Sequence, residues 1–272
     1  MAFADKVHAA QERTRSWVCL GLDPDPERIP PAFRAREDGM VAFNRAVIDA
    51  TRDCVCAYKP NLAFYLTRGS KGIDILAQTI DAIPRDMPVV LDAKFGDIES
   101  SAKGYAHFAF DVLGADAVTA SPYLGGDALA PFIDYADRAV FVLAHTSNPG
   151  SSIFQDASGG MEALYLRVAR FAASLKSKGE VGLVVGATFP EQLRAVRAAN
   201  PGAIFLIPGI GTQGGSLAEA VDFGENEQGI GPLINVSRSI LYASGGDDFA
   251  EAARAAARKM MDDINRKRQN HG

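Results

Sequence analysis

Cysteine is scarce in this sequence of 272 residues, which contains only Cys19, Cys54 and Cys56. An odd number of cysteines with no Cys-x-x-Cys pair fits neither a disulfide framework nor a zinc site. We therefore expect buried thiols in a protein of the reducing cytoplasm.

Long apolar runs and basic stripes are also missing. No apolar run reaches the roughly 18 residues that a membrane span needs, and residues 1–15 read as a polar amphipathic helix without a signal-peptide core. The formal net charge is −5, and the short basic run at 266–268 suits a solvated helix end. These features predict neither a membrane nor a nucleic-acid partner, so a phosphate ligand would have to be held locally.

The chain instead alternates short apolar runs with stretches of helical period. The expected strands are Ser16–Leu22, Cys54–Pro60, Met87–Lys94, Ala115–Ala120, Ala139–His145, Val181–Ala187, Ala203–Pro208 and Pro232–Ser237. The expected helices between and after them are Met40–Arg52, Ser70–Ala82, Ile98–Leu113, Gly126–Ala136, Gly160–Ser177, Pro190–Ala199, Leu217–Phe223 and Asp247–Lys267. Eight such units predict an α/β fold: a single (β/α)₈ TIM barrel with an N-terminal helix and extended βα loops, one domain over residues 1–272. No Gly-x-Gly-x-x-Gly follows the first strand, which disfavours a dinucleotide-binding fold.

Polar residues gather at the carboxyl ends of the expected strands. Asp23, Lys59, Asp92, Lys94, Ser121, His145, Pro208 and Arg238 all lie at or just past the end of a run. The βα loops of a barrel converge on this face, where the active sites of such enzymes lie. The placement predicts a functional site, although His145 has no carboxylate near it in sequence and is more often structural in such a position.

The third run ends with Asp92 and Lys94, and Asp97 follows at the start of the next helix, which completes an Asp-x-Lys-x-x-Asp pattern. Strand alternation points Asp92 and Lys94 to the same side, and Lys59 ends the neighbouring strand. A structural ion pair with a helix-capping Asp97 would also explain the pattern. Two ammonium groups and two carboxylates in alternation are costly to bury, however, which favours a catalytic array.

Glycine-rich turns follow the seventh and eighth strands. Ile207–Gly215 and Asn235–Ile240 occupy the loops that bind phosphate in many barrels, where glycine lets backbone N–H groups approach the oxygens. Arg238 can add a bidentate contact. The alternative to phosphate binding is that these glycines only allow the chain to turn.

The segment Leu91-Asp92-Ala93-Lys94-Phe95-Gly96-Asp97-Ile98 resembles the signature of orotidine 5′-phosphate decarboxylases, and the long loops near Gly125 and Gly150 resemble its longer bacterial subgroup, type 2. Asp23 and Lys59 fall where that family has matching residues. The resemblance implies a carboxy-lyase of pyrimidine (UMP) biosynthesis that needs no cofactor and no metal. It also implies the following contacts: Asp23 with a ribose hydroxyl, Ser147 with the pyrimidine, Pro208, Gln213 and Arg238 with the phosphate, and Asp97, Ile98 and Ser101 with the neighbouring site of a homodimer.

Two positions depart from the family pattern. Ser237 precedes the phosphate arginine where relatives often have glycine, and we expect it to be a substrate-binding residue that could tighten the turn or donate its hydroxyl. Ser101 replaces a family threonine and keeps the hydroxyl.

The expected mechanism assigns Lys94 as the cation beside C6 and the proton donor. Asp92 would face the departing carboxylate, and Lys59 and Asp97 would orient the array. Two alternatives stay open: a metal-dependent sugar-phosphate decarboxylase or aldolase of the same superfamily, and a non-catalytic sensor of a phosphoribosyl ligand. Lys59 disfavours the first, because an ammonium repels a divalent cation.

Overall fold

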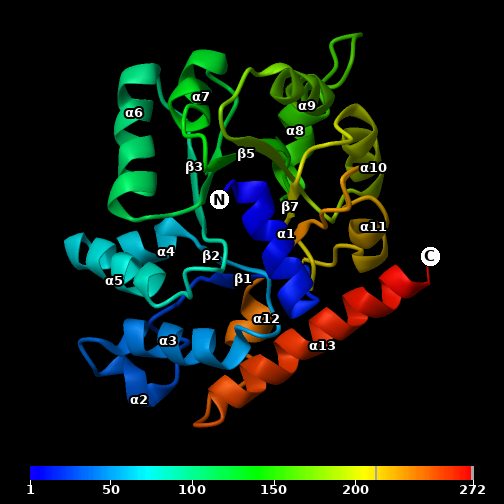
Figure 1. Ribbon diagram of the computed structural model, residues 1–272. Helices are drawn as coiled ribbons and strands as arrows, with labels where there is room; N and C mark the ends of the chain where they lie inside the picture. The colour runs from blue at the N-terminus through cyan, green and yellow to red at the C-terminus, as the bar shows by residue number, and fades with distance from the viewer. Residues whose placement is uncertain (212, 271–272) are drawn as a thin grey trace.

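A computed structural model describes residues 1–211 and 213–270 and contains one parallel eight-stranded sheet (Figure 1). The strands are β1 Val18–Leu22, β2 Ala57–Pro60, β3 Val90–Phe95, β4 Ala117–Ala120, β5 Ala139–His145, β6 Glu180–Val185, β7 Phe205–Ile207 and β8 Leu233–Val236. Their order in the sheet is β2-β1-β8-β7-β6-β5-β4-β3. Consecutive strands are therefore paired, except that β2 and β3 lie at the two ends of this order, and β1 pairs with β8.

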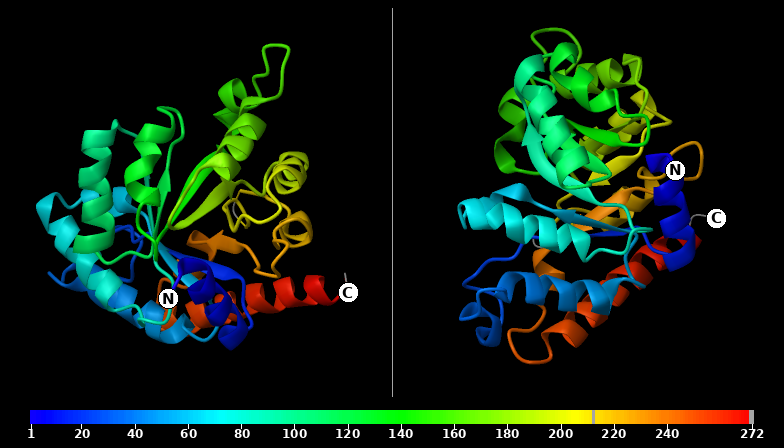
Figure 2. Two further views of the ribbon diagram at one scale, coloured as in Figure 1. Left: turned by 45° about the horizontal axis from the view of Figure 1, so that its top comes forward. Right: turned by 60° about the vertical axis from the view of Figure 1, so that its left-hand side comes forward.

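Backbone contacts between β2 and β3 bring the two ends of the sheet together. Tyr58 bridges Val89, Asn61 bridges Asp92, and the Tyr58 N–H donates to the Pro88 carbonyl at 3.0 Å. The sheet therefore curls into a nearly closed barrel with helices around its outside (Figure 2). The predicted TIM-barrel fold is confirmed.

Helices follow most strands and cover their outer faces. The longer ones are α1 Phe3–Thr14, α3 Gly39–Thr51, α5 Ser70–Asp81, α6 Glu99–His107, α7 Gly126–Ile133, α9 Leu164–Ser174, α10 Pro190–Ala199 and α13 Phe249–Gln269. The shorter ones are α2 Pro31–Arg34, α4 Leu62–Leu66, α8 Ser152–Gln155, α11 Leu217–Asp222 and α12 Arg238–Leu241, with a 3₁₀ turn at Pro149–Ser151. The sequence pattern did not predict α2, α4, α8 or α12, because helices of four or five residues show no clear periodicity.

The expected helix Ile98–Leu113 changes character partway. It is α-helical as α6 and then continues as a π-helical turn, Phe108–Val112. The expected second strand begins only at Ala57, because Cys54 lies in the turn that leads from α3. These differences lie at other ends of the elements. The carboxyl ends of β2 and β3, which carry Lys59 and Lys94, lie within one residue of the predicted positions.

The three cysteines are free and buried, as predicted.

Helix α1 closes the end of the barrel at which the strands begin. Lys6 pairs with Asp116 at 2.7 Å, and the Gln11 amide donates to the Gly231 carbonyl at 2.9 Å. Both partners precede strands, so α1 covers the amino ends of the strands, across the front of the barrel in Figure 1. Among the described residues, no helix is long and apolar enough to cross a membrane.

Candidate active site

The Asp92 carboxylate is the centre of a charged cluster at the carboxyl mouth. Lys59 Nζ on β2 lies 2.9 Å from its Oδ2, and Lys94 Nζ lies 2.7 Å from its Oδ1. The Thr119 hydroxyl on β4 donates to Oδ1 at 2.9 Å, and the Asn61 amide lies 3.4 Å from Oδ2. Donors from three strands therefore fix one carboxylate.

The two lysines differ in exposure. The Lys59 side chain is 4% exposed, whereas that of Lys94 is 49% exposed. The charge of Lys59 is enclosed by protein, whereas the side chain of Lys94 is half open to solvent.

The backbone at Lys94 leaves regular strand geometry. Its φ of 49° lies in the left-handed region, and the β3–β4 register shifts between Leu91 and Phe95. The backbone N–H groups of Ala93 and Lys94 both donate to the Thr119 hydroxyl, at 3.1 and 2.9 Å. Asp92 and Lys94 do meet, as predicted, but a bulged turn held by Thr119 brings them together and simple strand alternation does not.

Burial and charge oppose each other in this cluster. Burial would raise the pKa of Asp92, but attraction to Lys59 and Lys94 outweighs it and holds that pKa well below its ordinary value. Burial would likewise lower the pKa of Lys59, but Asp92 and Asp23 raise it above its usual range. Both groups therefore stay charged at neutral pH.

Asp23, just after β1, lies on the same rim. The Ser237 hydroxyl donates to its Oδ2 at 2.7 Å. Its Oδ1 is buried and has no hydrogen-bond partner among the described residues, and the same holds for Oδ1 of Asn235 on β8. Both residues line a cavity of about 200 Å³ at the mouth, so these two acceptors lie beside space for a ligand.

The loops after β5 and β7 close the other side of this cavity. Ser147 Oγ donates to Gln213 Oε1 at 3.0 Å, and Pro208, Gly209 and Arg238 also line the space. Gly209 has a φ of 104°, which other residues rarely adopt. The predicted phosphate and pyrimidine residues are thus brought to one cavity with Asp23, Lys59 and Asp92.

Asp97, Ile98 and Ser101 are not brought into this cluster. Asp97 Oδ1 accepts only from the Ile98 N–H among the described contacts, at 2.8 Å, and Ile98 is 59% exposed. Ser101 lies one turn into α6 and lines a separate cavity of about 500 Å³ beside Leu66 and Tyr105. Within this chain, three of the four predicted charges, Lys59, Asp92 and Lys94, form the cluster, and Asp97 lies outside it.

Sequence reasoning missed Thr119, Asn61 and Asn235. Asn61 and Asn235 interrupt or follow apolar strands, a signal that could have marked them; Thr119 gave none, because threonine is common in strands. His145 is fully buried, with Nε2 3.1 Å from Asp156 and its ring against Tyr165 and Phe189. This packing fits the structural role.

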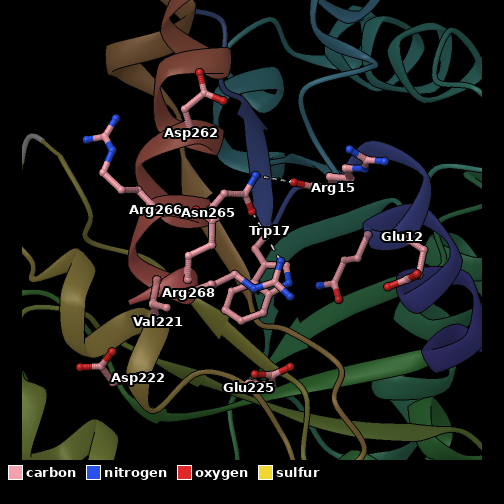
Figure 3. Close-up of a pocket in the computed structure, with 12 residues that line it drawn as sticks. Glu12, Arg15, Trp17, Val221, Asp222, Glu225, Asp262, Asn265, Arg266 and Arg268 are labelled. Carbon is pink, nitrogen blue, oxygen red and sulfur yellow. Dashed lines mark hydrogen bonds between the residues drawn. The ribbon is translucent and has the colours of Figure 1, made fainter. Parts of the chain in front are cut away.

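A wider cavity of about 1110 Å³ opens at the amino end of the barrel (Figure 3). There the Arg268 guanidinium lies 4.1 Å from the centre of the Trp17 ring, and the Asn265 amide donates to the Arg15 carbonyl at 2.9 Å. Carboxylates and guanidinium groups are mixed along its walls: Glu12, Arg15, Asp222, Glu225, Asp262, Arg266 and Arg268. This cavity at the amino end is the larger of the two. The cavity at the carboxyl mouth, however, is lined by Lys59 and Asp92 of the charged cluster, and we therefore identify the carboxyl mouth as the candidate active site.

Known proteins resemble the chain over almost its whole length. Residues 16–256 match the model of the orotidine 5′-phosphate decarboxylase / HUMPS family. Orotidine 5′-phosphate decarboxylases of Thermomicrobium roseum and Herpetosiphon aurantiacus are 51% and 48% identical, over 99% and 95% of this chain and 97% and 96% of theirs. The solved OMP decarboxylase of Leishmania donovani is 42% identical with a TM-score of 0.85, covering 98% of this chain and 99% of that one. The solved UMP synthase of Leishmania donovani is 43% identical with a TM-score of 0.87, and the match spans 98% of this chain but 57% of that longer protein. The chain therefore belongs to the orotidine 5′-phosphate decarboxylase / HUMPS family.

Proposed function

We propose that this chain converts orotidine 5′-phosphate to uridine 5′-phosphate and CO₂ in the biosynthesis of UMP. The observation that carries the proposal is the Lys59–Asp92–Lys94 cluster, in which a buried ammonium and a half-exposed one both pair with the Asp92 carboxylate that lines the cavity. The names of its relatives support the same activity. We treat residues 1–272 as a single catalytic domain.

Lys94 performs the central step. When the C6–carboxylate bond breaks, its electron pair stays on C6, and the ammonium stabilises this carbanion and then gives it a proton. A fixed charge in a partly dry site needs little reorganisation, which makes such stabilisation large. Asp92 faces the departing carboxylate, and Lys59 holds Asp92 from behind.

The remaining residues bind the rest of the substrate. The unpartnered Oδ1 of Asp23 accepts from a ribose hydroxyl, and Ser147 contacts the pyrimidine. Pro208, Gln213 and Arg238 hold the phosphate, whose binding energy helps to organise the site.

A metal-dependent reaction of the same superfamily fits these side chains less well. A divalent cation at Asp92 would meet the ammonium groups of Lys59 and Lys94, both within 3 Å of that carboxylate. The sensor alternative leaves the strained, half-exposed Lys94 without a purpose.

One assay tests the function. Purified protein added to orotidine 5′-phosphate should cause the loss of its ultraviolet absorbance at the same rate with and without EDTA. Loss of activity in EDTA would favour the metal-dependent reaction, and tight UMP binding without turnover would favour the sensor. Arg238→Ala should weaken binding of UMP but not of uridine; equal weakening of both would refute its phosphate role.

We also propose that two copies of the chain share their active sites. Asp97, Ile98 and Ser101 lie on an exposed segment, and Leu66, Ile98 and Tyr105 are 51%, 59% and 39% exposed nearby. A second copy would cover this apolar surface and receive Asp97 into its own cluster. Light scattering should give twice the chain mass, and mixing inactive Lys94→Ala and Asp97→Ala proteins should restore activity after subunit exchange. No recovery after verified exchange would refute sharing.

We place the enzyme in the cytoplasm, where its three buried, unpaired thiols would stay reduced.

A further inference from the structure

The short segment that follows β8 holds the loop after β1 at two points. Its first residue, Ser237, and the residue after α12, Tyr242, both contact Asp23. Between them, α12 begins with Arg238. The residue that lines the phosphate side of the cavity and the two residues that hold Asp23 therefore belong to one six-residue stretch.

Ser237 holds the carboxylate of Asp23. Its Oγ donates to Oδ2 at 2.7 Å, which leaves Oδ1 as the oxygen that lacks a partner among the described residues. The carboxyl torsion of aspartate is broad, so without this bond the two oxygens can rotate. The hydroxyl thus selects which oxygen is presented to the cavity.

Gly21 makes room for this contact. A Cβ built on Gly21 would lie 1.8 Å from Ser237 Oγ and 3.1 Å from Asp23 Oδ2. Any side chain at this position of β1 would displace the serine. Gly21 on β1, which has no side chain, therefore leaves the space that the hydroxyl of Ser237, just after β8, occupies.

Tyr242 holds the backbone of the same loop. Its hydroxyl donates to the Asp23 carbonyl at 2.9 Å and accepts from the Asp25 N–H at 2.7 Å. The Arg28 guanidinium lies over one face of the Tyr242 ring, 3.9 Å from the ring centre. Asp23 is thus fixed at both its side chain and its main chain.

We propose that Ser237 and Tyr242 are positioning residues for Asp23, and that α12 links the phosphate-binding Arg238 to the carboxylate that recognises the ribose. Ser237 acts through Asp23, whose Oδ2 accepts the hydrogen bond of its hydroxyl. The inference rests on the proposed function for the identity of the ligand.

Binding of nucleotides tests the role of Ser237 separately from catalysis. Dissociation constants of UMP, 2′-deoxy-UMP and 3′-deoxy-UMP are measured by calorimetry for wild type, Ser237→Ala and Asp23→Ala. Asp23→Ala should leave the affinity of one deoxy analogue unchanged. That analogue lacks the ribose hydroxyl from which Asp23 accepts a hydrogen bond. Ser237→Ala should weaken UMP about 10-fold, as expected for one coupled contact, but should weaken that analogue less than about 2-fold.

Two further variants complete the test. Tyr242→Phe should show the same selectivity for the hydroxyl with a smaller loss. Ser244→Ala is the matched control, because Ser244 also donates to a carboxylate, that of Asp248, but lies outside the cavity; its affinities should not change. Melting temperatures of all variants verify that they fold.

Each result is decisive. Equal weakening of all three nucleotides by Ser237→Ala would show that the serine acts on the phosphate or on the fold, and unchanged affinity for UMP would show that it does not position Asp23. Either outcome overturns the inference. If the selective loss is found but orotidine 5′-phosphate is not decarboxylated, the proposed function fails while the positioning role stands.

Discussion

Thr119→Val replaces a hydroxyl by a methyl group of similar size at the point where three hydrogen bonds meet. The hydroxyl donates to Asp92 Oδ1 and accepts from the N–H groups of Ala93 and Lys94. A hydrogen bond to a charged group is worth about 1.5–3 kcal/mol, and a buried N–H left without an acceptor costs about 1–3 kcal/mol. Because Thr119 is 1% exposed, water replaces little of this, and we expect a loss of about 3 kcal/mol of stability.

The effect on activity should exceed the effect on binding. Thr119 holds the left-handed turn at Lys94, and a misplacement of about 1 Å in a reacting group can cost about 100-fold in rate. We expect a fall in Tm of roughly 6–12 °C and a fall in kcat of about 10- to 100-fold, with UMP affinity little changed. Calorimetry and the absorbance assay measure these quantities.

Thr51→Val provides the control. Thr51 is equally buried and its hydroxyl bonds to the Val47 carbonyl and Tyr58, away from the cavity. It should lose stability and keep kcat. If Thr119→Val kept kcat within 2-fold while its Tm fell, the turn at Lys94 would not be what positions the ammonium.

Three other results are expected. Lys94→Ala should lower kcat by at least about 10⁴-fold, because one group supplies both charge and proton, while calorimetry shows UMP still bound; near-normal turnover would refute its role. The depressed pKa of Asp92 adds stability that is present above about pH 4 and lost as pH falls through the lower folded-state pKa, and the raised pKa of Lys59 keeps its contribution up to about pH 10. Urea unfolding should therefore show a smaller acid-side loss of stability in Asp92→Asn than in wild type, because the lowered pKa values of Asp38, Asp53 and Asp111 remain; an equal loss would contradict the contribution of Asp92. Gly21→Ala should lower Tm, and adding Ser237→Gly should restore most of it, because the clash of 1.8 Å is with the serine hydroxyl; additive losses in the double variant would contradict this geometry.

The barrel and the ring of polar residues could be predicted because topology decides them. Once eight strands are parallel and closed, every residue at a carboxyl end lies on one rim, so Asp23, Lys59, Asp92 and Arg238 had to share it. Closure of the barrel brings β2 against β3, which places Lys59 beside Asp92. The family prediction, made from residues 91–98, is confirmed over residues 16–256.

Contacts between strands could not be predicted from spacing alone. Thr119 lies in an apolar run where threonine is an ordinary strand residue, and its contact with Asp92 depends on the β3–β4 register. Asp97 was expected to join the array from the Asp-x-Lys-x-x-Asp pattern, and to reach the site of a neighbouring copy from the family resemblance. The strand ends at Phe95, and among the described contacts Asp97 accepts only from the Ile98 N–H, so it does not join the cluster of its own chain.

The conformation of Lys94 joins the energetics of the fold to the proposed chemistry. A non-glycine residue in the left-handed region costs about 1–2 kcal/mol, and a carboxylate taken out of water carries a desolvation penalty that its two ammonium partners have to offset. A regular strand would avoid the first cost, and an apolar pair would avoid the second. The turn that carries the strain leaves Lys94 Nζ 2.7 Å from Asp92 while keeping the side chain about half exposed. Stability alone would favour neither feature, whereas a reaction that needs a preorganised cation beside a carboxylate, open to substrate, requires both.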